Sequence, residues 1–175
     1  MAESRHPFVS LAVEAIQAFV LEQRVLDPGE GLFAEIPDAH RPSGAFVSLK
    51  RAGELRGCIG TVEPTKGSLI AEIIHNAISA ASRDPRFPAV QASELDDLVV
   101  SVDVLSAPQP VLDFSELNHR RYGLVVRSGG RQGVLLPDIE GINSEGEQLA
   151  VVRQKAGVTQ ADAADLFRFE VVRYR

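Results

Sequence analysis

The sequence predicts an α+β fold in which helices pack on a mixed, largely antiparallel sheet. Two pairs of strand-like segments, each joined by a short turn that contains glycine, indicate antiparallel hairpins. Helical patterns are interspersed with these hairpins, without the regular strand–helix alternation of a parallel sheet. The chain has 175 residues, of which 45% are hydrophobic, so it is long enough to bury a core. We expect a single domain over residues 1–175, made of two lobes that share a core.

The first third of the chain contains a helix, an irregular connection and a hairpin. Apolar residues three and four apart predict an amphipathic helix over 7–23, and Pro7 suits its first turn. The stretch 27–44 holds three prolines and three glycines and is expected to be irregular, with at most one short element. Two strands, 45–50 and 54–62, are expected to form a hairpin around the turn at 51–53.

The remaining elements follow from capping residues, prolines and alternation. Ser68 is placed to cap a helix that should stop at Asp84, because Pro85 disfavours helical geometry in the residue before it. The segment 84–88 is then a rigid, charged corner. Further along the chain we expect a strand at 98–105, a hairpin at 124–127 and 132–136, a helix from the capping box at 144–147 to Gly157, and a final strand over 166–174.

Charge and cysteine content exclude several classes of protein. Eighteen Lys plus Arg against 24 Asp plus Glu give a net charge of −6, which opposes binding to phosphate backbones. The arginines near 120–131 are the one basic cluster and leave a nucleic-acid-binding regulator as an alternative. A single cysteine cannot form an intramolecular disulfide, and no apolar run reaches 18 residues, so we expect a cytoplasmic protein.

The densest group of chemically useful residues is the segment 55–61, Leu-Arg-Gly-Cys-Ile-Gly-Thr. Period-two geometry in a strand places Arg56 and Cys58 on one face, where the guanidinium would lower the pKa of the thiol. Gly57 and Gly60 would leave open backbone that a ligand or another backbone can approach closely. The competing interpretation is that Cys58 is a small packing residue in the core.

A nucleophilic thiol needs a base, and the sequence offers four histidines. His40, in the connection that leads to the first hairpin, is the candidate, whereas His75 lies next to the apolar stripe of a helix and suits packing. The sequence lacks His-x-x-x-His, Cys-x-x-Cys and a phosphate-binding glycine loop. We therefore predict no metal site and no cofactor, and whether the protein is an enzyme stays open.

The hexapeptide at 55–60, together with Ala45-Phe46-Val47-Ser48-Leu49 before it and Asp84-Pro85-Arg86-Phe87-Pro88 after it, closely resembles the AMMECR family, also called AmmeMemoRadiSam system protein A. Further similar stretches extend the resemblance over nearly the whole chain, for example Tyr122-Gly123-Leu124 and Lys155-Ala156-Gly157. The resemblance implies a mixed fold with a larger and a smaller subdomain. It also implies a pathway shared with Memo-like and radical-SAM proteins, although it does not supply a reaction.

The resemblance and the residues together give a candidate site. Cys58 is its candidate catalytic residue, and the candidate ligand-binding residues are Arg56, Gly57, Gly60, Asp84, Arg86 and Phe87. Asp84 is expected to pair with Arg56 or to hold Arg86, either fastening the corner or shaping a pocket. The leading hypothesis is a cleft at the hairpin and the corner that binds a small molecule or a peptide segment, with Cys58 contacting or reacting with it. The alternatives are a non-catalytic protein-interaction module and the nucleic-acid-binding regulator.

Overall fold

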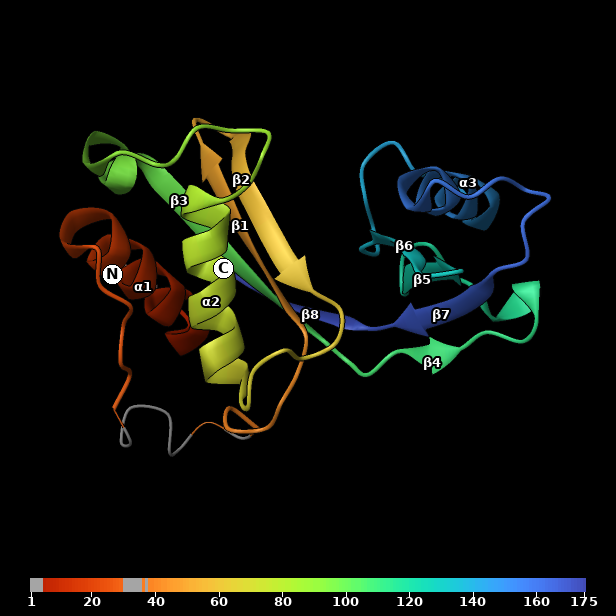
Figure 1. Ribbon diagram of the computed structural model, residues 1–175, viewed down its shortest axis with the longest axis horizontal. Helices are drawn as coiled ribbons and strands as arrows, with labels where there is room; N and C mark the ends of the chain where they lie inside the picture. Colours follow the sequence, from red (N-terminus) through yellow and green to blue (C-terminus); the bar gives the residue numbers. More distant parts are fainter. Residues whose placement is uncertain (1–4, 30–35, 37) are drawn as a thin grey trace. The chain divides into compact units, whose positions relative to one another are not determined.

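The computed structural model describes residues 5–29, 36 and 38–175, which form two compact units (Figure 1). The first unit comprises the described residues up to 104 together with 172–175, and the second comprises 105–171. In chain order the elements are α1 (Pro7–Glu22), β1 (Ala45–Arg51), β2 (Glu54–Thr61), α2 (Leu69–Ser82), the 3-10 helix η1 (Ala92–Asp97), β3 (Leu98–Leu105), β4 (Gln109–Pro110), the 3-10 helix η2 (Phe114–Glu116), β5 (Gly123–Ser128), β6 (Arg131–Leu135), α3 (Glu145–Ala156), β7 (Asp165–Phe169) and β8 (Val171–Tyr174). The predicted α+β class is confirmed.

In the first unit, α1 and α2 pack on one face of a four-stranded sheet with the order β2-β1-β3-β8 (Figure 1). β1 is a central strand that pairs antiparallel with both β2 and β3. Its residues Ala45, Val47 and Leu49 are fully buried in the cluster formed with the two helices. Because side chains alternate along a strand, Phe46 and Ser48 lie on the opposite face of this sheet.

The capping residues act as the sequence predicts. Ser68 accepts a hydrogen bond from the Ala71 N–H at the start of α2, and Ser144 accepts one from the Glu147 N–H at the start of α3. Gly157 ends α3 in the left-handed conformation, with φ 65°. These local signals fixed the helix boundaries to within two residues.

A buried carboxylate fastens the connection between β2 and α2. Glu72, on the first turn of α2, is fully buried and accepts hydrogen bonds from the Thr61 and Thr65 hydroxyls and from the Thr65 and Lys66 N–H groups. Burial opposes ionisation of Glu72, but the four donors outweigh it and lower the pKa of this carboxyl. The connection therefore holds the end of β2 against the start of α2.

The second unit has its own sheet, with the order β4-β7-β5-β6, and α3 packs with it. Its buried cluster includes Leu124 and Val126 of β5 and Val152 and Ala156 of α3. Each unit thus has a cluster of buried apolar side chains, and the shared core stays a prediction.

Two expectations need correction or restriction. The predicted final strand over 166–174 is two strands, because the pairing is interrupted at Glu170 between β7 and β8, which belong to different sheets. Of the predicted irregular connection, residues 27–29, 36 and 38–44 contain no helix or strand, while 30–35 and 37 lie outside the described residues. None of the described helices is both long and apolar enough to cross a membrane.

Candidate functional site

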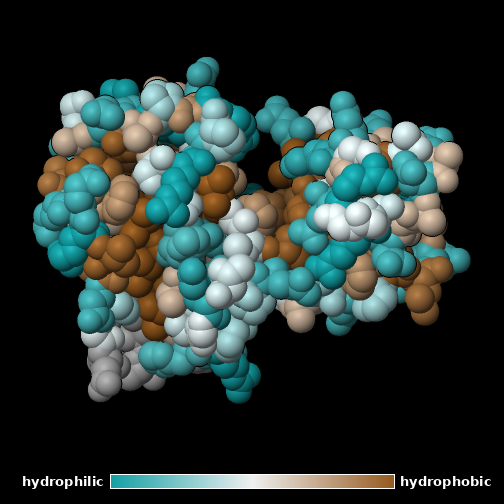
Figure 2. All heavy atoms as spheres, in the orientation of Figure 1, coloured by the Kyte–Doolittle hydropathy of each residue, from teal (hydrophilic) through white to brown (hydrophobic). Residues whose placement is uncertain are grey.

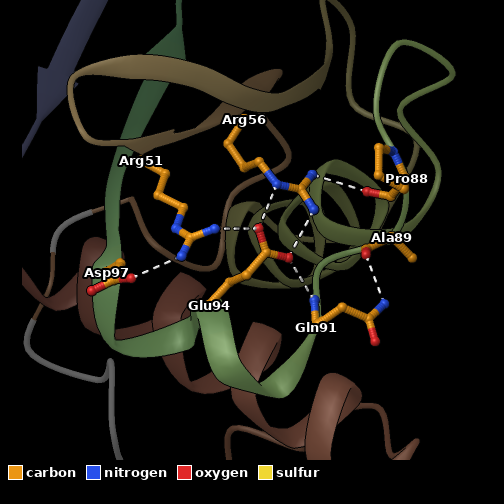
Figure 3. A network of polar contacts seen from close by, with 7 residues as sticks. All are labelled: Arg51, Arg56, Pro88, Ala89, Gln91, Glu94 and Asp97. Carbon is orange, nitrogen blue, oxygen red and sulfur yellow. Dashed lines mark hydrogen bonds and ion pairs between the residues drawn. The ribbon is translucent and has the colours of Figure 1, made fainter.

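A β-bulge in the first hairpin directs Arg56 away from the regular strand pattern. Leu49 pairs with Gly57 and Lys50 pairs with Leu55, so Arg56 is the extra residue of β2. Its guanidinium makes two parallel hydrogen bonds to Glu94 of η1, each 2.9 Å long, and Nη1 donates to the Pro88 carbonyl oxygen at 2.9 Å (Figure 3). All three nitrogens of Arg56 are therefore engaged by the protein itself.

Glu94 is the centre of this network (Figure 3). Besides Arg56, it accepts hydrogen bonds from the Gln91 N–H at 2.8 Å and from Arg51 at 3.3 Å, while Arg51 also pairs with the exposed Asp97. The hydrogen bonds from Arg56 and then from Gln91 lower the pKa of Glu94 to about 2. The structure gives no support to the predicted role of Arg56 in binding an anionic ligand, because its side chain is only 13% exposed and its nitrogens already bind Glu94 and Pro88.

The charged corner covers the free edge of β2. Asp84, which is 4% exposed, accepts a hydrogen bond from the Cys58 N–H at 2.9 Å, and Arg86 donates to the Cys58 carbonyl oxygen at 3.4 Å. The Asp84 carboxylate also accepts hydrogen bonds from Nε and Nη2 of Arg86, at 3.0 and 2.7 Å. Of the two expected pairings, Asp84 with Arg56 or with Arg86, the structure has the second. The corner supplies hydrogen-bond partners to an edge strand that would otherwise be open.

The two glycines of the signature serve close packing. A Cβ atom at Gly57 would lie 2.3 Å from the Ala80 carbonyl oxygen of α2, and one at Gly60 would lie 2.1 Å from Cγ of Phe46. Of the two expected close neighbours, a ligand or another backbone, Gly57 has the second, because the backbone of α2 fills the space there; at Gly60 an aromatic ring fills it.

Cys58 lies on the sheet face opposite the helices. It is directly opposite Ser48 of β1, whose own neighbour on β3 is Ser101. The thiol is partly exposed, and the Ser48 hydroxyl donates to its sulfur at 3.2 Å. The Cys58 side chain is therefore not fully buried in the core.

The expected lowering of the Cys58 pKa is wrong. Burial raises the pKa of the thiol, and the hydrogen bond from Ser48 and the nearby charge of Arg86 only partly offset this. The cation that acts on the thiol is Arg86 rather than Arg56, because the bulge directs Arg56 toward Glu94. Burial therefore favours the protonated thiol over the thiolate.

The histidine predicted as a base for Cys58 lies elsewhere. The residues on either side of His40 bind the first turn of α2, since the Leu69 and Ile70 N–H groups donate to the Arg41 and Ala39 carbonyls. The corner at Cys58 follows the last turn of this 14-residue helix, about 20 Å away along its axis. His40 is therefore not the activating base. Among the described residues, no three His, Cys, Asp or Glu side chains gather as metal ligands.

The basic cluster near 120–131 is divided among partners within the second unit. Arg121 pairs with Glu170 at 2.9 Å, Arg131 donates to the Gly157 carbonyl oxygen, and Arg127 donates to Gln132. These contacts do not favour a nucleic-acid surface.

Arg86 is the signature residue with an available charged group. Its side chain is 54% exposed, and within the described part of the chain its Nη1 has no hydrogen-bond partner. Asp84 fixes the other nitrogens, and the Phe87 ring centre lies 5.5 Å from the guanidinium carbon. The structure thus brings together Cys58, Asp84, Arg86 and Phe87 at the edge of β2.

Sequence reasoning missed two residues that build this site. Glu94 is not singled out in the sequence analysis, although it lies three residues after Gln91 in a capping box. Ser48 was part of a matching stretch, and its position opposite Cys58 follows from the hairpin register. The pairing of Ser48 with Cys58 cannot be counted from the turn at 51–53 alone, because the bulge shifts the register by one residue.

We expect the stability of the protein to fall in the acid range, because both site carboxylates have lowered pKa values. Arg86 holds the pKa of Asp84 well below its ordinary 3.8, and that of Glu94 is about 2 against 4.5. A group whose pKa is lower in the folded state stabilises the fold above its unfolded pKa and loses that contribution as the pH falls. Urea unfolding at pH 7, 5, 4 and 3 should show a steep loss of unfolding free energy below pH 5. Asp97→Asn, at an exposed carboxylate, should leave the slope unchanged, whereas a flat profile from pH 5 to 3 would contradict the assignment.

Comparison with known proteins agrees with the resemblance noted in the sequence. The model of the AMMECR1 family matches residues 9–174. A protein of Thermotoga maritima is 49% identical over 97% of this chain and 98% of its own, and one of Clostridium acetobutylicum is 38% identical over 99% of this chain but only 36% of its own. The crystal structure of an uncharacterised protein from Pyrococcus horikoshii superposes with a TM-score of 0.85, at 32% identity, covering 95% of this chain and 88% of that one.

Proposed function

We propose that this chain, which belongs to the AMMECR1 family, recognises a small molecule or a peptide segment at the edge of β2, through Arg86 and Cys58. The observation that carries the proposal is the state of Arg86, whose guanidinium is held by Asp84 yet half exposed. A guanidinium held in this way loses little conformational freedom when it binds a carboxylate or phosphate. The ligand we propose therefore carries an anionic group.

The thiol fits recognition better than nucleophilic attack. Its pKa is raised by burial, so little thiolate is present at neutral pH, and Ser48 already donates to the sulfur. The S–H group is left as a weak donor for an acceptor on the ligand. Cys58 is thus proposed to contact the ligand.

The other signature residues are proposed to position these two groups. Asp84 orients Arg86, and the Phe87 ring packs beside its guanidinium. Gly57 lets α2 approach β2 so that the corner reaches the edge of that strand. Arg56, through Glu94 and Pro88, holds the segment that follows the corner.

We further propose that the protein acts in the cytoplasm beside Memo-like and radical-SAM proteins. The single cysteine suits a reducing compartment. The association with these partners is an implication of the family resemblance. The alternative is an interaction module that uses the same edge to bind a protein and no small ligand.

Because Cys58 is the sole cysteine, its alkylation by iodoacetamide reports on the site directly. We expect a rate at pH 7 below that of free glutathione and an apparent pKa above about 8.5. Inorganic phosphate, glutamate, succinate and short acidic peptides at millimolar concentration would be the probes. At least one should slow alkylation saturably, because an anion on Arg86 would cover the thiol.

The matched variants separate binding from a general charge effect. Arg86→Gln should abolish the protection, whereas Arg120→Gln, at an exposed arginine of the second unit, should retain it. If no probe slows alkylation and Arg86→Gln alters only thermal stability, the corner is a fastener and the proposal is wrong. An apparent pKa well below 8.5 would instead support a reactive thiol.

A further inference from the structure

A groove of about 920 Å³ lies beside α2 in the first unit, on the helix side of the sheet, which is the opposite side from the Cys58 thiol. Its walls are α2 and the end of α1 with the segment that follows. The apolar side chains that line it are Phe19, Val25, Leu26, Ile70, Ile74 and Ile78. Figure 2 shows apolar side chains gathered over the helical part of this unit, with hydrophilic ones beside them. The site proposed above does not use this groove.

Two rows of side chains run along α2 at the groove. Ile70, Ile74 and Ile78 are spaced by four residues and form an apolar row. The row next to it consists of His75, Ser79 and Arg83, which are also spaced by four residues. The lining on this side therefore extends from Ile70 to Arg83, about 20 Å along the helix axis.

The charge of the groove is opposite to that of the whole chain. Lys66 and Arg83 are positive, against the single carboxylate of Asp27, and the lining also contains His40 and His75. The chain as a whole carries −6. Burial lowers the pKa of His75, and the charges of Lys66 and Arg83 lower it further against the opposing charge of Glu72. The groove thus combines an apolar floor with a concentration of positive charge.

We propose that this groove is a docking site for an acidic amphipathic helix of a partner protein. An apolar stripe three to four residues apart on such a helix would contact the accessible side chains of Phe19, Val25 and Leu26, next to the nearly buried row of isoleucines on α2. Acidic residues flanking that stripe would pair with Lys66 at one end and Arg83 at the other. A compact anion would meet only one of these two cations, since they lie beyond opposite ends of α2. An elongated occupant with several carboxylates matches both.

The probe is a fluorescein-labelled peptide of about 14 residues, about 21 Å long as a helix, with leucines three and four apart and glutamates beside them. Fluorescence anisotropy with the full chain should show saturable binding. A second peptide, with lysine in place of every glutamate, should bind at least tenfold more weakly. The double variant Lys66→Gln/Arg83→Gln should weaken binding of the acidic peptide about 2- to 30-fold, as expected for two exposed ion pairs.

Matched controls test whether the groove itself is the binding surface. Arg120→Gln/Lys155→Gln makes the same change in net charge on the second unit and should leave the affinity unchanged. Val25→Glu, on a wall residue that is 66% exposed, should weaken binding, while Leu112→Glu, at a 91% exposed residue of the second unit, should not. Circular dichroism of each variant checks that it is folded.

Three results with the peptides and the variants would overturn the proposal. They are an absence of saturation below about 1 mM, equal binding of the acidic and basic peptides, and an unchanged affinity in both the Lys66→Gln/Arg83→Gln and Val25→Glu proteins. A fourth result would be that octanoate competes for the groove more strongly than the acidic peptide does. The groove would then be assigned to a small amphipathic anion, and this would also overturn the proposal.

Discussion

Replacement of Gly57 by alanine should destabilise the protein by about 3 kcal/mol, the upper part of the range for overpacking a tight contact. The added Cβ would lie 2.3 Å from the Ala80 carbonyl oxygen and 3.2 Å from the Ala80 carbonyl carbon. Both atoms belong to the backbone of α2, so no side-chain rotation relieves the clash and the helix must move. Urea unfolding followed by circular dichroism measures the loss.

The same substitution should also disturb the site, because Asp84 follows the last turn of α2 and binds the Cys58 N–H. As the helix shifts, this hydrogen bond weakens and alkylation of Cys58 in the native protein should become faster. Gly67→Ala is the matched control, since nothing lies within 4 Å of a Cβ there, and it should change neither stability nor labelling appreciably. If the Gly57→Ala protein is as stable as the Gly67→Ala protein, the close packing of α2 on β2 at Gly57 is not required. The account of how the corner reaches the edge of β2 would then be wrong.

The parts of the fold that the sequence predicted are those set by local signals. Apolar spacing and capping residues located α1, α2 and α3, and short turns with glycine located both hairpins. The final strand was misjudged because alternation continues on both sides of Glu170. Which sheet a strand joins depends on pairing with distant strands, and that information is not contained in its own pattern.

The candidate site was predicted as a set of residues but not as an arrangement. The sequence brought Cys58, Asp84 and Arg86 together correctly, since a helix between them must return the corner to the hairpin. It placed Arg56 beside Cys58, whereas a bulge redirects the Arg56 side chain to Glu94 without leaving a clear trace in the pattern. The sign of the Cys58 pKa shift was also wrong. Burial competes there with a nearby cation, and only the packed structure shows that burial is the larger effect.

The ion pair between Arg56 and Glu94 leads to the second large effect, an expected loss of about 3 kcal/mol in Glu94→Gln. The two side chains are only 13% and 12% exposed, so removing one charge leaves the other nearly buried without a counter-ion. The glutamine would also present an NH₂ group where Glu94 now accepts hydrogen bonds from Arg56 and the Gln91 N–H. Unfolding free energy at pH 7 is the measurement.

Two further variants distinguish the buried pair from the exposed rim of the same network. Asp97→Asn removes only the contact with Arg51 and, at 59% exposure of the Asp97 side chain, should cost less than about 1 kcal/mol. Arg56→Met combined with Glu94→Gln removes the unpaired charge, so the double variant should be more stable than the sum of the two single changes implies. Additive losses would mean that the two residues stabilise the fold independently. The segment between the corner and η1 would then be held by its other contacts, and the proposed positioning role of Arg56 would be lost.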